Sequence, residues 1–252
     1  MTNASPDPTG QSPRDATNWA QSGVGLKVAD VPTGAVNINV DGRRVVGPLQ
    51  GFGALWQKTY QVRLRRDDLT PAEIIRVWKG RFPDFQPPQN RFYPSVAGVA
   101  PGEVVLINAS LQGLPVGTGV MVLYADDESF TLMTPQGHPE SGWVTFSAFQ
   151  DEGDEATIVA QVQSMARAND PIYELGFKLG GSQAQEQIWT HVLTALSAHF
   201  ECERDVSLSK TCVDPKLQWS QAKNIWHNAA MRSMLHTLGA PVRWVRGMFR
   251  KT

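Results

Sequence analysis

Apolar and polar positions alternate with two different periods along the chain, and the change of period divides it into segments. Residues 55–64 alternate as a β-strand with one buried face does. A helix is predicted next, because Thr70 can cap its start, Pro71 suits its first position and Glu73 completes a capping box. The buried stripe of this helix is predicted to consist of Ile74, Val77 and Trp78.

A connection rich in proline and aromatic residues, 82–101, precedes five strand-like runs. The runs lie at short spacing and are separated by turn residues, at 102–111, 118–126, 129–134, 142–150 and 155–168. This pattern predicts an antiparallel meander. Several runs are apolar on both faces, so we expect both sides of the central strands to be covered.

Two helical patterns follow the meander. Residues 182–200 place apolar side chains at steps of three and four, which predicts a long helix across one face of the sheet (Ile188, Trp189, Val192, Leu193, Leu196 and Phe200). Residues 217–238 predict a second helix with its own apolar face (Trp219, Ala222, Trp226, Ala230 and Met234). The predicted class is α+β, a helix-grip fold in which a curved antiparallel sheet surrounds a long C-terminal helix, with a further helical extension and a cavity between sheet and helix.

Composition places the boundaries between these parts. Residues 1–23 are rich in Pro, Gly, Ser, Thr, Asn and Asp and predict a disordered tail. Residues 24–50 are expected to form an N-terminal hairpin around Asp41-Gly42, since both turn residues accept positive φ. The helix-grip domain is then 51–200, and 201–252 is a linker followed by a basic helical extension.

Charge and hydropathy restrict the partners and the compartment. The chain has 252 residues, 23 Lys plus Arg, 24 Asp plus Glu and 41% hydrophobic residues, which is typical of a globular protein without a general affinity for nucleic acid. No apolar run reaches the length of a membrane span and no secretory signal is visible, so a cytoplasmic location is expected.

The C-terminal segment departs from this neutral balance. Beyond Asp214 the chain has seven Lys and Arg residues and no acidic residue. One interpretation docks the apolar face of 217–238 onto the exposed side of the sheet, which the size of Trp219 and Trp226 favours. The alternative, left open for the last dozen residues, is weak contact with an anionic membrane, with Trp244 and Phe249 at the interface.

Signals for metals and cofactors are weak. Cys202 and Cys212 lie ten positions apart without a second pair, so two reduced thiols are expected, with a short-loop disulfide as the alternative. The sequence contains no phosphate-binding Walker loop, no dinucleotide fingerprint and no nucleophile elbow. We expect neither a metal nor a cofactor.

The turn Gly137-His138-Pro139-Glu140-Ser141-Gly142 is the strongest candidate for chemistry. Glycines at both ends allow positive φ, and the side chains of His138 and Glu140 are expected to point outward together. A histidine beside a carboxylate can act as a general base near neutral pH. The simpler interpretation, which we favour, is a corner in which the histidine caps a backbone group.

Three stretches carry a resemblance to a known family. They are "GFGALWQKTYQV", "GVMVLYADDESFTLMTPQGHPESGWVTFSA" and "VAQVQSMARANDPIYELGFKLGG". Together they resemble the family 1990 of domains of unknown function, which is grouped with the START-like, helix-grip proteins, and the match runs from about Gly51 to about Phe200. The resemblance implies a helix-grip fold with a cavity, and it implies no established reaction.

The predicted ligand site combines large aromatic residues with one polar cluster. Arg167 and Tyr173 can orient a carboxylate or carbonyl, although a structural ion pair of Arg167 with Glu174 explains the same residues. The ligand-binding set is Tyr60, Trp78, Tyr93, Trp143, Arg167, Tyr173 and Trp189.

Three functions are compatible with these residues. The favoured one, which depends on the resemblance, is non-catalytic binding of a small apolar or amphipathic molecule between sheet and helix. One alternative is a cyclase- or hydrolase-like enzyme using His138 and Glu140. The other is a structural or interaction protein whose core is filled by its own aromatic side chains.

Overall fold

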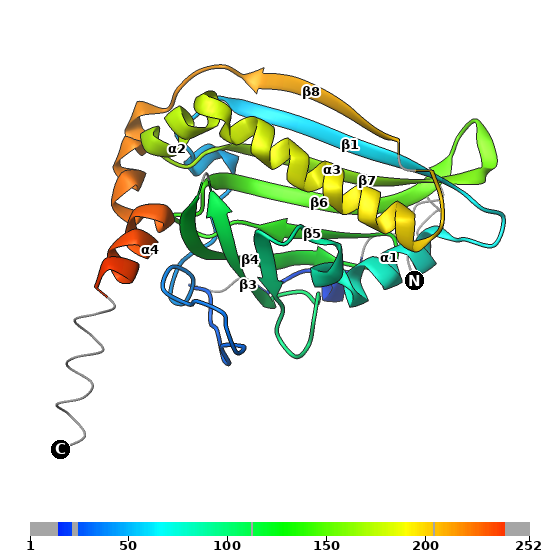
Figure 1. Ribbon diagram of the computed structural model, residues 1–252, viewed down its shortest axis with the longest axis horizontal. Coiled ribbons are helices and arrows are strands. Elements are labelled where there is room, and N and C mark those ends of the chain that lie inside the picture. The colour runs from blue at the N-terminus through cyan, green and yellow to red at the C-terminus, as the bar shows by residue number, and fades with distance from the viewer. Residues whose placement is uncertain (1–14, 22–24, 112, 204, 240–252) are drawn as a thin grey trace, which may run out of the picture.

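A single antiparallel sheet dominates the computed structural model, which describes residues 15–21, 25–111, 113–203 and 205–239 (Figure 1). Within these residues the sheet has eight strands in the order β2-β3-β4-β5-β6-β7-β1-β8. The strands are β1 (Leu55–Arg65), β2 (Asn90–Tyr93), β3 (Val104–Leu111), β4 (Leu114–Ala125), β5 (Ser129–Met133), β6 (Glu140–Asp151), β7 (Asp154–Ala168) and β8 (Val206–Asp214). Each strand from β2 to β7 pairs with the next, so the predicted meander is confirmed.

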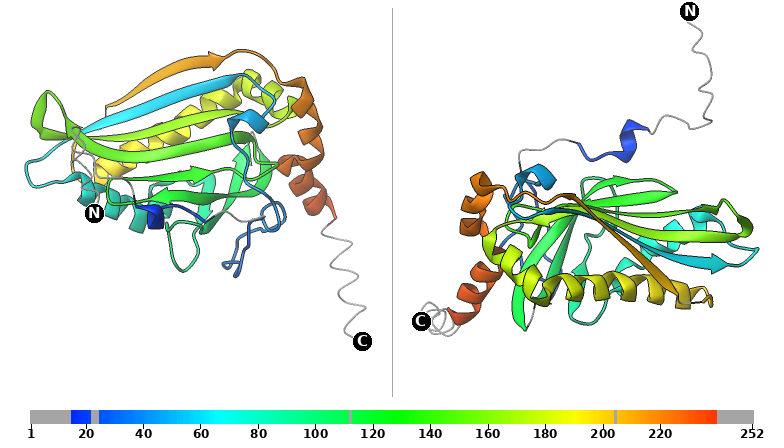
Figure 2. Two further views of the ribbon diagram at one scale, coloured as in Figure 1. Left: turned by 180° about the vertical axis from the view of Figure 1, so that it is seen from behind. Right: turned by 90° about the horizontal axis from the view of Figure 1, so that it is seen from above.

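Two helices cover one face of this sheet, and the sheet curves around the longer one (Figure 2). α1 (Pro71–Gly80) begins as predicted, with Thr70 Oγ1 accepting the backbone N–H of Glu73 at 3.2 Å. α3 (Ser182–His199) is the predicted long helix and buries four apolar side chains against the sheet (Trp189, Val192, Leu193 and Leu196). The α+β helix-grip class is therefore confirmed.

The opposite face of β3 and β4 is covered mainly by the N-terminal segment, and α4 (Ala229–Leu238) of the C-terminal extension packs on part of β4. Leu26 and Val40 pack there against Val104 and Leu106. Part of the predicted tail also reaches the sheet, because the Trp19 ring lies 4.7 Å from that of Tyr124. Residues 1–14 and 22–23 of that tail lie outside the described residues.

The predicted hairpin at Asp41-Gly42 is wrong, although the turn itself forms with Gly42 at φ +74°. The described residues of 24–50 contain no strand, only the short 3-10 helix η2 (Pro48–Gln50). Both flanks bind the main sheet region instead of each other: Val36 N–H donates to Asn108 Oδ1 at 3.0 Å, and Val46 N–H donates to Thr134 O at 2.9 Å. Contacts with the sheet thus replace the pairing that the local pattern favoured.

The C-terminal part also differs from its prediction. The expected linker contains β8, which pairs with β1 and forms an edge of the sheet. The expected single helix is two, the 3-10 helix η5 (Trp219–His227) and α4 (Ala229–Leu238), which Asn228 separates and caps. The two tryptophans of η5 do not dock on the sheet, since Trp219 is 72% exposed and Trp226 is 81% exposed.

Polar contacts hold this extension against one end of the sheet (Figure 1). Asn224 Nδ2 donates to Gln50 O at 2.7 Å, and Asn228 Nδ2 donates to Asp170 Oδ2 at 2.8 Å. The backbone N–H of Ala230 donates to the Tyr173 hydroxyl at 2.9 Å. Buried hydrogen bonds, which a hydrophobic period cannot reveal, therefore decide how the extension docks.

Candidate functional site

A cavity of about 150 Å³ lies between the sheet and the N-terminal half of α3. Most of its wall is apolar and comes from β2 to β7 and α3, including Phe92, Ile107, Val116, Val120, Leu132, Val144, Ile188 and Trp189. A few polar side chains interrupt this wall, among them Thr118, His138, Glu140 and Ser164. We call this space the inner cavity.

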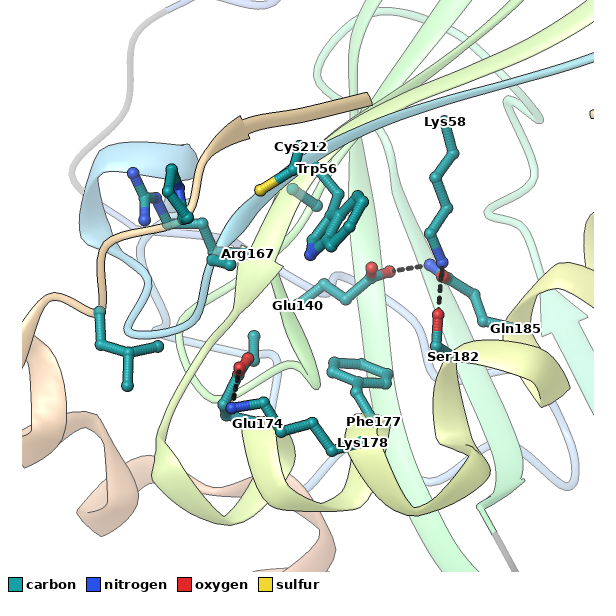
Figure 3. Close-up of a pocket in the computed structure, with 15 residues that line it drawn as sticks. Trp56, Lys58, Glu140, Arg167, Glu174, Phe177, Lys178, Ser182, Gln185 and Cys212 are labelled. Carbon is teal, nitrogen blue, oxygen red and sulfur yellow. Dashed lines mark hydrogen bonds and ion pairs between the residues drawn. The ribbon is translucent and has the colours of Figure 1, made fainter. Parts of the chain in front are cut away.

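A second, larger pocket of about 540 Å³ adjoins the first (Figure 3). Its wall is more polar and is built from β1, the end of β7, the start of α3 and the chain after β8 (Trp56, Lys58, Arg167, Glu174, Lys178, Ser182, Cys212 and Leu217). We call it the outer pocket. Four residues line both spaces: Glu140, Ala166, Phe177 and Gln185.

These shared residues form a partition between an apolar and a polar compartment. The Glu140 carboxylate accepts a hydrogen bond from Gln185 Nε2 at 2.6 Å, and the Phe177 ring lies close to the pair (Figure 3). Phe177 begins η4 (Phe177–Gly181), a π-helical turn between α2 (Pro171–Gly176) and α3. This turn is kinked, with Gly180 at φ +108°, and such π-helical irregularities are frequent at functional sites.

A buried lysine stands beside the partition. Lys58 is only 7% exposed, and its Nζ donates to Ser182 Oγ and Gln185 Oε1, both at 2.9 Å. It also forms an ion pair with Glu186 at 3.2 Å. Burial opposes the charge on Glu186, but Lys58 and Lys210 together hold the pKa of this carboxyl below its usual value. The N-terminal turn of α3 is thus fixed to β1 by charge-assisted hydrogen bonds.

The negative charge of Glu140 is less well stabilised by its neighbours than the charge of Glu186. Burial raises the pKa of its carboxyl, and Lys58 and the hydrogen bond from Gln185 offset only part of this effect. The group therefore takes up a proton more readily than an ordinary glutamate. Protonation of Glu140 would remove the negative charge from the partition.

His138 caps the backbone, as the simpler interpretation predicted. Its Nδ1 accepts the backbone N–H of Glu140 at 3.0 Å, and burial lowers its pKa to about 4, so the ring is neutral at neutral pH. Contrary to expectation, His138 and Glu140 do not point outward, because both line the inner cavity. The Glu140 carboxylate bonds to Gln185 instead of to the imidazole.

The glycines at both ends of this turn are required by close packing as well as by positive φ. A Cβ at Gly137, where φ is +93°, would lie 2.1 Å from His227 O on the extension. A Cβ at Gly142 would lie 2.1 Å from Met165 O on β7. Gly137 therefore allows the C-terminal extension to approach the turn, and Gly142 allows close packing of the turn on β7.

The structure disperses the predicted ligand-binding residues. Trp143 and Trp189 line the inner cavity, and Arg167 lines the outer pocket. Tyr60 and Trp78 lie in the solid part of the core, whereas Tyr93 packs on the opposite face of the sheet. Tyr173 is buried and holds the start of α4 through its hydroxyl group.

Arg167 joins three parts of the chain. It is 2% exposed, and its Nη1 donates to Gly53 O at 2.7 Å and to Lys216 O at 2.9 Å, while Nη2 pairs with Asp214. The predicted pair with Glu174 is wrong, because Glu174 pairs with Lys178 at 3.1 Å. The partners of Arg167 come from segments far away in the sequence.

Two polar groups of the inner cavity wall have no hydrogen-bond partner among the described residues. They are Thr118 Oγ1 and Trp189 Nε1. Both residues are almost fully buried, with exposed fractions of 2% and 9%. An unpaired polar group in the interior costs about 1–3 kcal/mol, which a bound acceptor could recover.

Among the lining residues that the sequence analysis missed are Lys58 of the outer pocket, Thr118 of the inner cavity, and Phe177 and Gln185 of the partition. One of them did carry a signal: alternation along β1 puts Lys58 on the same face as Tyr60 and Val62, where a lysine is unusual. Phe177 and Gln185 could not have been found, since the kink that positions them follows no apolar period.

Metal ligands, disulfides and membrane-spanning helices would indicate other classes of site. In the described part of the chain, no three His, Cys, Asp or Glu side chains gather into a group that could hold a metal ion. Cys202 and Cys212 are both free thiols. No helix of the described residues is long and apolar enough to cross a membrane.

Comparisons with known proteins concern the fold. No family model and no curated protein matches the chain, so the resemblance to the family 1990 is not confirmed. Similar solved structures include a START superfamily protein from Mycobacterium smegmatis, with 18% identity over 58% of this chain and 97% of that one and a TM-score of 0.40. Another is the di-domain ARO/CYC StfQ from the steffimycin biosynthetic pathway, with 10% identity over 59% and 51% of the two chains and a TM-score of 0.44.

Proposed function

We propose that the protein binds a small amphipathic molecule, with its apolar part in the inner cavity and its polar group in the outer pocket. The observation that carries this proposal is the pairing of the two spaces. One is apolar and the other polar, and they share the side chains of Glu140, Phe177 and Gln185 as a partition. Ligand sites generally combine an apolar wall with a few polar groups that fix orientation.

Size limits what the inner cavity can hold. About 150 Å³ is below the roughly 300–1,000 Å³ of most ligand pockets, and an apolar cavity of this size suits a molecule as small as benzene. A single ring or a short alkyl chain therefore fits without rearrangement. A longer molecule has to extend past the partition into the outer pocket.

The partition could open through a local rearrangement. One hydrogen bond joins Glu140 to Gln185, which Lys58 also holds at 2.9 Å, and the ring of Phe177 is carried by the kinked turn η4. A ligand carbonyl or hydroxyl oxygen in the inner cavity could accept from Thr118 or Trp189, whose polar groups lack a partner among the residues described. We infer a ligand with an acceptor near its apolar end.

The first test is native mass spectrometry of the purified full chain, with bound molecules identified after denaturation. We expect a co-purifying molecule with an apolar ring or chain and at least one oxygen. The test is then repeated on Ser164→Leu, which fills the inner cavity from β7. The matched control is Gln163→Leu, because Gln163 points to the other face, where it bonds to Thr59.

Loss of the molecule in Ser164→Leu together with retention in Gln163→Leu supports the proposal. Retention in both variants would place the molecule elsewhere and contradict it. If the wild type carries nothing, fluorescent fatty acids and aromatic dyes are titrated as probes. Failure of every probe to bind to the wild type in preference to Ser164→Leu would favour a core that serves only for packing.

A further inference from the structure

α4 turns its apolar side away from the protein. Its large apolar residues follow the spacing i, i+3, i+4 and i+7, which places them on one helical face. Their exposed fractions are 40% for Met231, 41% for Met234, 64% for Leu235 and 69% for Leu238. The side that packs on β4 carries the small residues Ala229 and Ser233, both buried. This is the reverse of an ordinary surface helix.

Specific hydrogen bonds fix this inverted orientation. Ser233 Oγ accepts the backbone N–H of Gly117 at 2.9 Å and Asn39 Nδ2 at 3.2 Å. Asn228 caps the helix by accepting the N–H of Met231 at 3.0 Å. Rotation of α4 to bury its apolar stripe would break these buried bonds, so the stripe is held outward by the fold.

The neighbouring element η5 adds two exposed tryptophans, Trp219 at 72% and Trp226 at 81%. Together with the α4 stripe they form what we call the outward surface (Trp219, Trp226, Met231, Met234, Leu235 and Leu238). Large apolar residues exposed together on one part of a protein commonly mark an interaction site. Tryptophan in particular is enriched where an apolar phase meets water.

The charged residues of the extension that carries the outward surface have one sign. Lys216, Lys223 and Arg232 are exposed on the same extension. After Asp214 the sequence has no Asp or Glu, and residues 240–252, which lie outside the described residues, add four more Lys and Arg. A partner for this segment therefore has to be apolar and negatively charged.

We propose that the outward surface docks on an anionic lipid bilayer. Exposed Trp, Leu and Met among basic residues match the composition of segments that lie in the interfacial region of a membrane. A second copy of the chain fits less well, because a two-fold interface brings the same patch of both copies together and would oppose their lysines without a carboxylate from either segment. The proposal does not depend on what the pockets bind.

The outward surface is adjacent in sequence to a residue that lines the outer pocket. Leu217, next to the outward surface in sequence, lines the outer pocket, as do Phe177 and Lys178 of the neighbouring η4. Docking by η5 and α4 would thus hold the outer pocket close to the bilayer. A molecule dissolved in the membrane could then reach the pocket without crossing much water.

Sedimentation with vesicles tests the proposal on the full chain. We expect binding to vesicles of phosphatidylcholine with phosphatidylglycerol, weak binding to phosphatidylcholine alone, and release by salt. Leu235→Ser with Leu238→Ser should lower the partition coefficient at least about tenfold. Lys216→Glu with Lys223→Glu should lower it by roughly fivefold or more for each residue changed.

Matched controls alter exposed residues far from η5 and α4. Val96→Ser with Phe149→Ser removes exposed apolar side chains, and Arg63→Glu with Arg76→Glu reverses exposed charges near the end of β1 and on α1. Both pairs should bind vesicles like the wild type. Equal binding to neutral and anionic vesicles, or loss of binding in the controls as well, would contradict the proposal. A dimer in light scattering that Leu235→Ser with Leu238→Ser abolishes, without any vesicle binding, would assign the surface to a second copy.

Discussion

The space between the sheet and its helices has a filled half and a hollow half. In the filled half, Trp78 of α1 packs edge-on against Phe146 at 5.2 Å, and Phe146 stacks on Phe130 at 4.6 Å. In the hollow half, beside the start of α3, the same sheet carries Thr118 and Ser164 and encloses the inner cavity. The same sheet thus packs tightly against α1 and encloses a cavity beside the start of α3.

β7 shows how the difference arises. Its inward side chains in the filled half are Ile158, Ala160 and Val162, whereas those that reach the cavity are the small Ser164 and Ala166. The backbone continues without interruption through both regions, paired to β1 and β6. Two successive small inward side chains on β7 therefore contribute to the hollow.

Removing a ring from the filled half should have the largest effect. Trp78 is fully buried and contacts two aromatic rings, so Trp78→Ala should lower the free energy of unfolding by about 3–5 kcal/mol. Urea denaturation measures this loss. The control is Trp226→Ala, because the exposed Trp226 should contribute less than about 0.5 kcal/mol. Similar losses in the two variants would mean that the filled half is not the stabilising core.

Acid should destabilise the protein through His138, which lines the inner cavity in the hollow half. Burial lowers the pKa of His138 to about 4, below its unfolded value near 6.5. Between these values the unfolded chain binds a proton that the folded chain does not, so stability falls as the pH falls. This single group should account for up to about 3 kcal/mol.

His138→Asn removes the titrating ring and leaves an acceptor for the N–H of Glu140. We expect its unfolding free energy to match that of the wild type within about 1 kcal/mol at pH 7, and to fall less between pH 6.5 and pH 4. The control, His191→Gln, changes an exposed histidine of α3 and should keep the acid sensitivity of the wild type. Equal acid sensitivity in His138→Asn would show that the ring is hydrated in solution.

The sequence predicted the filled half better than the hollow half. Strand alternation and helical stripes located β1, the meander, α1 and α3, because burial of large residues imposes a period. β8 was missed because an edge strand exposed on both faces has no apolar side to reveal it. β2 was missed because prolines surround its four residues.

The candidate site was predicted only in part, for a related reason. Trp143 and Trp189 were assigned to the site because they are large aromatic residues. A cavity, however, forms where side chains are small, as at Ser164. Small residues contribute little to the hydrophobic pattern of a sequence. Lys58 and Gln185 meet across more than one hundred positions of sequence. The apolar face predicted for 217–238 was wrong, because the segment forms two helices and the exposed stripe of α4 shares only Met234 with that face. The buried bonds of Asn228 and Ser233 determine how α4 is oriented.

The smallest predicted effect compares two threonines that line the same cavity. Thr118 Oγ1 has no partner among the described residues, whereas Thr134 Oγ1 accepts the N–H of Gly142 at 3.0 Å. Thr118→Val should raise the free energy of unfolding of the ligand-free protein by about 1 kcal/mol, while Thr134→Val should lower it by a similar amount. With ligand present, Thr118→Val should bind more weakly if the hydroxyl donates to the ligand. A loss of stability in Thr118→Val without ligand would show that the Thr118 hydroxyl is already paired. This hydroxyl would then not be available as a hydrogen-bond donor to a ligand in the inner cavity.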